Sequence, residues 1–169
     1  PFVDELNAEG GTTKSGLNAV CYVGGITEIR GLTELVKAMA KCPNTKLLLA
    51  GPVSPDNYIH QLESLEGWDR VEFMGKVDRK TVAEILSKSI AGVVTFHPLP
   101  NHVDAQPNKM FEYMSANLPV IGSHFELWEQ IIGGTDCGIC VDPESPDEIA
   151  AAINKLQDNP QLVEQMGEN

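Results

Sequence analysis

Short apolar runs alternate with amphipathic segments along most of the chain. Each run contains few charged residues, and several end in Gly, Pro, Asn or Asp. Runs of this length and composition are typical of buried β-strands. The expected strands cover 18–24, 46–50, 71–75, 91–96, 118–122 and 138–141.

The segments that follow these strands have the periodicity of helices. In 31–41, for example, Leu32, Leu35 and Met39 recur at the spacing of one helical face. Asp78 stands where its carboxylate could cap the start of another helix. The expected helices are 31–41, 57–65, one after Asp78, one that begins at Asn108, 125–132, 145–156 and a short one after Pro160.

Strands and helices therefore alternate through the whole chain. Strands without polar alternation are buried on both faces, which requires helices on both sides of the sheet. The pattern predicts an α/β fold, a doubly wound parallel sheet of about six strands with right-handed crossovers, Rossmann-like in its architecture. A length of 169 residues fits one domain that covers 1–169. Sheets of this kind bind ligands beyond the carboxyl ends of their strands.

The net charge of the chain limits the kinds of ligand that its surface can bind. The chain has 24 acidic and 12 basic side chains and a formal net charge of −12. This balance argues against a broad nucleic-acid or anionic-membrane surface, because both ligands require a basic field. We expect no nucleic-acid partner and no membrane segment, since no apolar run approaches the roughly 20 residues of a span. The start of the chain also lacks the layout of a signal peptide, so we expect a cytoplasmic protein.

The four cysteines do not form a recognisable metal site. Cys137 and Cys140 form a single CxxC, and Cys21 and Cys42 lie far from it in sequence. A zinc site usually takes two such pairs, or one pair with histidines at ligand spacing. Redox chemistry of the thioredoxin kind would place the CxxC at a helix start, whereas this one lies at the last expected strand. We interpret all four as structural thiols.

The loop after the first strand has features of an anion site. The stretch YVGGITEIRG (22–31) contains Gly24, Gly25 and Gly31, with Arg30 just before a helix. It fits neither the dinucleotide fingerprint nor the Walker motif. Glycines at a strand-to-helix turn let a ligand approach the backbone, and a helix start beside an arginine suits a phosphate. The alternative is that the glycines only make the turn.

A second candidate lies in PNKMFEYM (107–114). Asn108 could cap the helix, and Lys109 and Glu112 would then lie on neighbouring positions of its surface. Taken alone, the stretch also fits a capped surface helix with one ion pair. His97 and His102, beyond the fourth strand, could approach a ligand there, although loop histidines are often only surface residues.

Together these stretches resemble a known family. YVGGITEIRG, LLLAGP, VEFMGKV and PNKMFEYMSANLPVIGS, in this order, are similar to the C-terminal, donor-binding domain of glycosyltransferase family 4. These are retaining enzymes of GT-B architecture. The resemblance runs from about Asn18 to about Met166. It implies that Arg30 binds phosphate. The family's second arginine falls on Gly25, and Lys109 is the candidate that replaces it.

The resemblance also assigns the other site residues. The second glutamate of the family's E-x7-E signature falls on Glu112, which is implied to bind the ribose of the donor, and the first falls on Asp104. The P-x-K-x-F-E-Y-M form of a branch of the family matches more closely still. Backbone groups of Gly75, Lys76 and Val77 are implied to hold the base. The helix-start amides of Asn108 and Lys109 are implied to meet the diphosphate, and Gly24 and Gly25 remain candidate binding residues from the loop after the first strand.

The expected function is glycosyl transfer from a nucleotide-diphospho-sugar such as a UDP-sugar or GDP-sugar, with retained configuration. No Asp-x-Asp occurs in the chain, so we expect no metal and no cofactor. The acceptor, a sugar or a lipid-linked sugar, would bind an N-terminal domain that this chain lacks. We expect a role in polysaccharide or glycoconjugate synthesis, in the cytoplasm or peripheral to the inner face of a membrane. The alternatives are a non-catalytic nucleotide-binding module and a nucleotide-sugar epimerase of related architecture.

Overall fold

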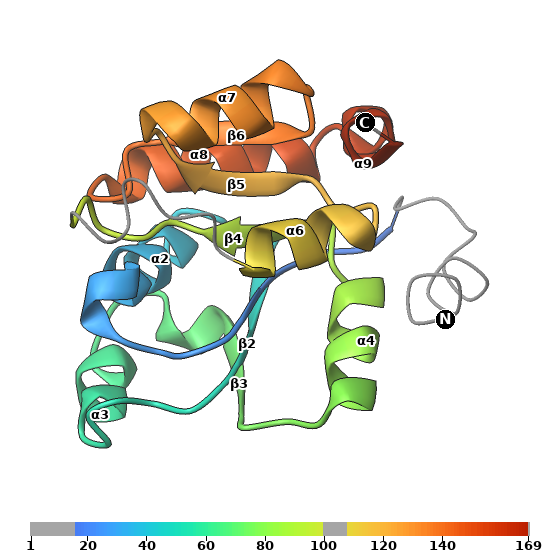
Figure 1. Cartoon of the computed structure of the whole chain (residues 1–169). Coiled ribbons are helices and arrows are strands. Elements are labelled where there is room, and N and C mark those ends of the chain that lie inside the picture. Colours follow the sequence, from blue (N-terminus) through green and yellow to red (C-terminus); the bar gives the residue numbers. More distant parts are fainter. Residues whose placement is uncertain (1–15, 100–107, 169) are drawn as a thin grey trace.

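The computed structural model describes residues 16–99 and 108–168, apart from the side chain of Asn108. It contains one sheet of six parallel strands in the order β3-β2-β1-β4-β5-β6 (Figure 1). The strands are β1 (Ala19–Val23), β2 (Lys46–Ala50), β3 (Val71–Gly75), β4 (Ala91–Val94), β5 (Val120–Ser123) and β6 (Gly138–Val141). The predicted α/β fold with a doubly wound parallel sheet is therefore confirmed.

Helices follow the strands as the periodicity predicts. The α-helices are α2 (Leu32–Met39), α3 (Tyr58–Glu63), α4 (Arg79–Ser87), α6 (Asn108–Ser115), α7 (Glu126–Gly134), α8 (Pro146–Gln157) and α9 (Pro160–Glu168), and the short 3-10 helices are η1 (Glu28–Arg30) and η2 (Trp68–Arg70). Among the described residues, two helix starts have side-chain caps. Asp78 accepts from the Thr81 N–H at 2.8 Å, as its position predicts, and Ser145 accepts from the Glu148 N–H at 3.2 Å.

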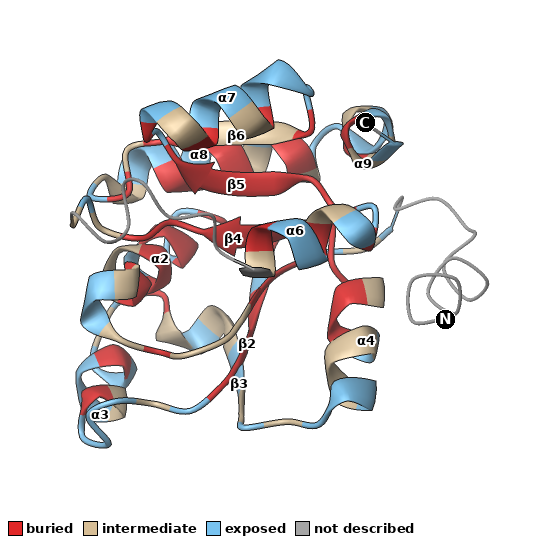
Figure 2. Cartoon of the chain, in the orientation of Figure 1, coloured by how far each residue is buried: buried red, intermediate tan, exposed pale blue. Residues whose placement is uncertain are grey.

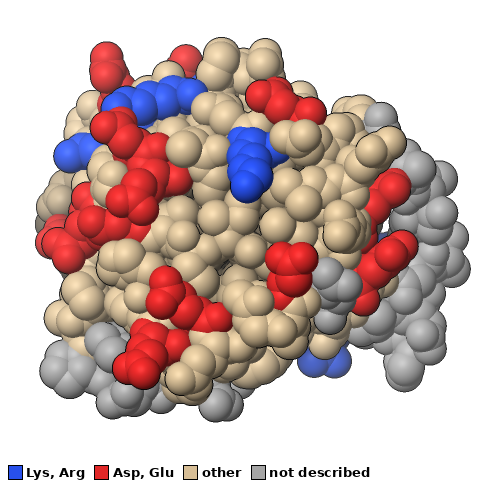
Figure 3. Space-filling model, turned by 90° about the horizontal axis from the view of Figure 1, so that it is seen from above, with Lys and Arg blue, Asp and Glu red and all other residues tan. Residues whose placement is uncertain are grey.

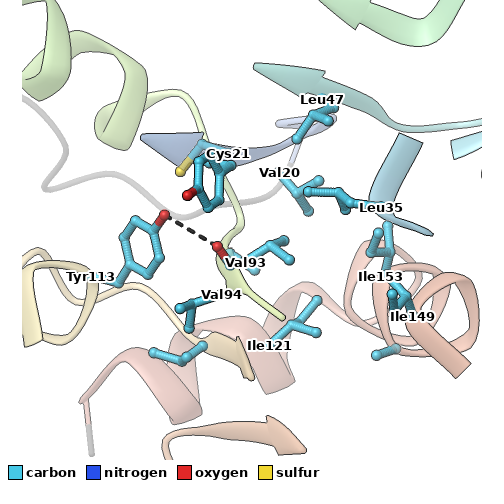
Figure 4. Packing of buried hydrophobic residues seen from close by; sticks show 14 of the residues in the cluster. Val20, Cys21, Leu35, Leu47, Val93, Val94, Tyr113, Ile121, Ile149 and Ile153 are labelled. Carbon is cyan, nitrogen blue, oxygen red and sulfur yellow. Dashed lines mark hydrogen bonds between the residues drawn. The ribbon is translucent and has the colours of Figure 1, made fainter. Parts of the chain in front are cut away.

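The helices cover both faces of the sheet. Leu35 of α2 and Ile149 of α8 pack on one side of β1 and β4, and Tyr113 of α6 packs on the other side (Figure 4). As a result β4 and β5 are buried along their full length (Figure 2). This double burial explains why these strands lack polar alternation in the sequence.

Element boundaries differ from the prediction by about two residues or fewer. Among the carboxyl ends of the strands, the largest difference is in β4, which ends at Val94 although the expected strand continues to Phe96. Beyond Val94 the chain leaves the sheet and meets the turn before α2. A Cβ atom on Gly31 would lie only 1.9 Å from the Thr95 carbonyl oxygen, and Gly31 has φ +81°. Glycine is therefore required at this crossing.

The cysteines agree with a structural role. None of the four forms a disulfide. Cys140 lies within β6, and Cys137 directly precedes this strand, so the CxxC is not at a helix start. Burial, and then the charges of Glu129 and Cys137, raise the pKa of Cys140 to about 11, which disfavours the reactive thiolate.

Acidic side chains are spread over the face that includes α7 and α8 (Figure 3). Over residues 121–168 the sequence contains ten Asp or Glu side chains and a single basic one, Lys155. An acidic face of this kind repels the phosphate backbone of nucleic acids. Among residues 16–99 and 108–168, none of the helices combines the length and apolarity that a membrane span requires.

Candidate functional site

The strand order places a topological switch point between β1 and β4, and we call the region outside their carboxyl ends the crevice. The two strands pair only at Val20 with Ala91 and at Cys21 with Gly92, and they separate toward their carboxyl ends. The chain winds from β1 to β2 and β3 in one direction and from β4 to β5 and β6 in the other. Ligands of doubly wound sheets bind at this kind of switch point, outside the carboxyl ends of the strands.

The glycine loop after β1 forms one wall of the crevice. A Cβ atom on Gly24 would lie 2.5 Å from Cε and 2.7 Å from Nζ of Lys109. A Cβ atom on Gly25 would lie 2.8 Å from a guanidinium nitrogen of Arg30. The absence of side chains at these two positions therefore lets both cations lie directly against the backbone.

Arg30 and Lys109 converge on one aromatic ring. The Arg30 guanidinium carbon and the Lys109 ammonium nitrogen each lie 5.4 Å from the centre of the Phe96 ring. Lys109 also lies 5.6 Å from the centre of the Tyr22 ring. Both distances are within the range of cation–π contacts. Within the described part of the chain, no carboxylate lies within 4 Å of either cation.

The two cations affect each other and their surroundings. Burial lowers the pKa of Lys109, the nearby Arg30 charge lowers it further, and Glu112 opposes both effects. Burial raises the pKa of Tyr22 to about 12, although the charge of Arg30 and a hydrogen bond from it oppose the rise. The Tyr22 hydroxyl stays protonated and donates to the Gly25 carbonyl at 2.6 Å. These contacts fix the arginine and the glycine loop together.

Two helices begin near the cations. Gly31 is the N-cap of α2 and makes no side-chain cap, so the N–H groups of the first turn have no side-chain acceptor at that residue. The helix α6 begins at Asn108, as predicted, but the capping prediction concerns a side chain outside the described residues. Helix starts carry partial positive charge, which adds to that of the cations.

The alternative of a capped surface helix with an ion pair predicts a different geometry. Glu112 is exposed on α6, and among the described salt bridges none joins it to Lys109. Lys109 instead turns toward Gly24 and the aromatic rings. The lysine of this stretch is therefore part of the crevice, and the glutamate remains available at its rim.

The predicted base-binding residues lie two strands away. Gly75 ends β3 with φ +66°, and Lys76 and Val77 follow it. Gly51 links this turn to the glycine loop: its N–H donates to the Gly75 carbonyl at 2.7 Å, and a Cβ atom on it would lie 1.7 Å from the Gly24 carbonyl oxygen. The turns after β1, β2 and β3 are therefore in direct contact.

The first acidic position of the E-x7-E signature, Asp104, and also His102 lie outside the described residues. His97 is described. Its backbone N–H donates to the Ile29 carbonyl at 2.9 Å, and its Nε2 lies 2.8 Å from Oε1 of Glu34. These contacts tie the loop after β4 to the segment around Arg30. Sequence reasoning missed Glu34 and Phe96, because their roles depend on contacts between distant segments.

Comparison with known proteins identifies the family. The family model Glycosyl transferases group 1 matches residues 4–169. A glycosyltransferase of Methanocaldococcus jannaschii described as uncharacterised is 30% identical over 141 residues, or 81% of this chain and 35% of that protein. The alpha-D-kanosaminyltransferase of Streptomyces kanamyceticus is 27% identical over 157 residues, or 89% of this chain and 39% of that protein. The chain thus spans less than half the length of these curated relatives.

Solved structures show the same fold. Sucrose-phosphate synthase of Thermosynechococcus elongatus matches 98% of this chain with 42% of its own, at a TM-score of 0.78 and 24% identity. The C-terminal domain of a Francisella tularensis group 1 glycosyltransferase, LpcC, matches this chain with a TM-score of 0.76 and 19% sequence identity. The match covers 98% of this chain and 87% of that domain. Anabaena HepE in complex with UDP-glucose matches with a TM-score of 0.73 and 18% sequence identity. The match covers 99% of this chain and 46% of HepE. The architecture is that of GT-B glycosyltransferases, as the resemblance implied.

Proposed function

The chain belongs to the glycosyl transferases group 1 family, and from this membership we propose that its crevice between β1 and β4 binds a nucleotide-diphospho-sugar donor for glycosyl transfer. The observation that carries the proposal is the convergence of Arg30 and Lys109 on Phe96, beside Gly24 and Gly25. In a chain of net charge −12, two cations without a close described carboxylate partner form a local site for an anion. The likeness to HepE, whose structure contains UDP-glucose, supports this ligand class.

The cations have a direct role in the proposed chemistry. When the bond between the sugar carbon and the donor phosphate breaks, its electron pair goes to the β-phosphate oxygen. Arg30, Lys109 and the start of α6 would stabilise this developing charge. We propose that these protein groups do what a bound metal ion does in other transferases, without a cofactor. Retention of configuration, as in family 4, belongs to the same proposal.

The remaining predicted residues would hold the rest of the donor. Glu112 lies near Lys109 on α6, one turn further along, where it would accept hydrogen bonds from ribose hydroxyls. Backbone groups of Gly75, Lys76 and Val77 would meet the base, since their turn contacts the glycine loop through Gly51. The length of the relatives supports an acceptor site on a further domain. We place the complete enzyme in polysaccharide or glycoconjugate synthesis on the cytoplasmic side.

Calorimetry with UDP, GDP and ADP, each compared with its nucleoside, tests the proposal. We expect at least one diphosphate to bind more tightly than its nucleoside, and Lys109→Met to remove most of this difference. Lys155→Met is the matched control, because it removes the same charge from an exposed position on α8. Failure of all three diphosphates to bind at millimolar concentration would contradict the proposed site.

The same titrations distinguish the alternative functions. Nucleotide sugars that bind no better than the nucleoside diphosphates, with no transfer by the complete protein, would favour a non-catalytic nucleotide-binding module. Conversion of the donor sugar into its epimer without any acceptor would indicate an epimerase. A dependence of affinity on the sugar, followed by transfer to an acceptor, is the result expected for the transferase.

A further inference from the structure

The hydrogen-bond ladder between β1 and β4 is interrupted by a side chain. In a parallel ladder that continued from the Cys21 and Gly92 pair, Val23 would face Val94, and its N–H would point at the Val93 carbonyl. The hydroxyl of Tyr113 occupies this position instead. It accepts from the Val23 N–H at 3.3 Å and donates to the Val93 carbonyl at 3.3 Å. Figure 4 shows the second of these bonds.

The surroundings hold Tyr113 in this place. The side chain is almost fully buried, at 1% exposure. Its ring lies flat against Gly92, where a Cβ atom would come within 2.3 Å of the ring. Burial raises the pKa of Tyr113 well above 10, so the hydroxyl remains a donor at every ordinary pH. A side chain at position 92 or a shorter residue at position 113 would break this arrangement.

Tyr113 also lies where it can fix the position of Lys109. The two residues are four apart on α6 and therefore lie one above the other on the same face of the helix. Tyr113 binds the backbone of Val23, and Lys109 covers Gly24, the next residue along. Any shift of α6 relative to β1 would move the lysine relative to the glycine loop.

We propose that Tyr113 is a positioning residue of the donor site: its hydroxyl takes the place of the next ladder bond, holds β1 and β4 apart at the crevice, and fixes α6 so that Lys109 meets the diphosphate. This inference rests on the proposed function. It assigns to the tyrosine of PNKMFEYM a role that acts through the lysine and not through contact with the ligand.

A double-mutant cycle tests this coupling. Tyr113→Phe retains the ring on Gly92 and removes only the hydroxyl. In the wild-type background we expect it to weaken binding of the preferred nucleoside diphosphate about tenfold, or about 1.4 kcal/mol, and to change nucleoside binding less than about twofold. In a Lys109→Met background the same substitution should change diphosphate binding less than about twofold, because the lysine it positions is gone. Ser89→Ala is the control, since it removes another buried hydroxyl, which donates to the Ile85 carbonyl and precedes the amino end of β4, opposite to the crevice.

The results of these titrations separate a failure of the proposed function from a failure of the inference about Tyr113. Absence of diphosphate binding by the wild-type chain contradicts the proposed function, and the inference with it. Wild-type binding with equal losses from Tyr113→Phe in both backgrounds, or with no loss in either, contradicts the inference alone. Amide hydrogen exchange of the wild-type chain gives a test that needs no variant to fold: the Val23 N–H should exchange far more slowly than that of the exposed Gly16. Equal rates would overturn the proposed bond.

Discussion

Lys109→Met should separate ligand binding from stability. The substitution removes the charge, retains most of the volume, and leaves the other crevice residues in place. For binding, the loss of one charged hydrogen bond to a phosphate is worth about 1.5–3 kcal/mol, which corresponds to about a 10–150-fold weaker diphosphate complex. Nucleoside binding should be unchanged, since neither base nor ribose meets this side chain in the proposed complex.

The effect of Lys109→Met on stability should be small because opposing changes nearly cancel. The variant loses cation–π contacts with Phe96 and Tyr22, worth about 0.5–1 kcal/mol each. It gains sulfur contacts with the same rings, at about 0.3–1.5 kcal/mol each. It also no longer has the free-energy cost of a partly buried ammonium close to the Arg30 charge. Burial and this charge are the two causes that lower the pKa of Lys109. We expect a net change within about 1 kcal/mol, or about 2–4 °C in Tm for a chain of this size.

Thermal unfolding by circular dichroism and calorimetric titration with a diphosphate and its nucleoside measure both quantities. Lys155→Met serves again as the control for the loss of one positive charge. The reasoning is refuted if Lys109→Met loses more than about 2 kcal/mol of stability while nucleoside and diphosphate affinities fall together, because the lysine would then be a structural residue.

Four further predictions follow from the same geometry. Arg30→Ala should weaken diphosphate binding by about 1.5–3 kcal/mol and leave nucleoside binding nearly unchanged; calorimetry that shows equal losses would make Arg30 structural. Glu112→Gln should weaken binding of a ribonucleotide more than that of its 2′,3′-dideoxy analogue; equal losses would exclude a ribose contact. Because the Lys109 pKa lies below its usual 10.5, diphosphate affinity should fall as pH rises through this lowered pKa. Arg30→Ala should move this fall in affinity to higher pH. If the two charges were independent, pH titrations across the alkaline range would show no such movement. EDTA should leave diphosphate binding intact, since no group of three metal-ligating side chains lies together among the described residues; a stoichiometric metal content of the purified protein would contradict this.

The pKa shift of Lys109 also has a consequence for folding. The unfolded chain binds this proton more tightly than the folded one, because the folded pKa is lowered. The lysine therefore destabilises the fold below its lowered pKa, and this penalty disappears as pH rises.

The sequence was sufficient to predict the fold because its signals are local. Apolar runs, helical periodicity and the cap at Asp78 each depend on neighbouring residues. The carboxyl end of β4 was less predictable: the run AGVVTF has strand character throughout, but the chain leaves the sheet after Val94, where Thr95 packs against Gly31. Tertiary contact here overrides the local preference.

The site was predictable in part. Arg30, Lys109 and the glycines stand in motifs, and the structure brings them to one crevice. The residues that hold them there could not be found from spacing. Phe96 looks like the end of a strand, Glu34 like a solvated helix residue, and Tyr113 like a core residue. Their roles arise between segments separated by 13 to 90 residues in the chain, and no local pattern records such contacts.

The free crevice holds its two cations in an arrangement that is unfavourable without a ligand. Lys109 is partly buried, and Arg30 places a like charge against the same aromatic ring. Both features lower the pKa of Lys109. In the proposed complex, a diphosphate would bring negative charge against both groups, relieve the repulsion between them and raise the pKa of Lys109. A ligand that binds only the folded state stabilises it, so diphosphate binding would offset the unfavourable free energy of this arrangement. In a chain of net charge −12, the local charge at this crevice opposes the overall charge, and this opposition favours anion binding here.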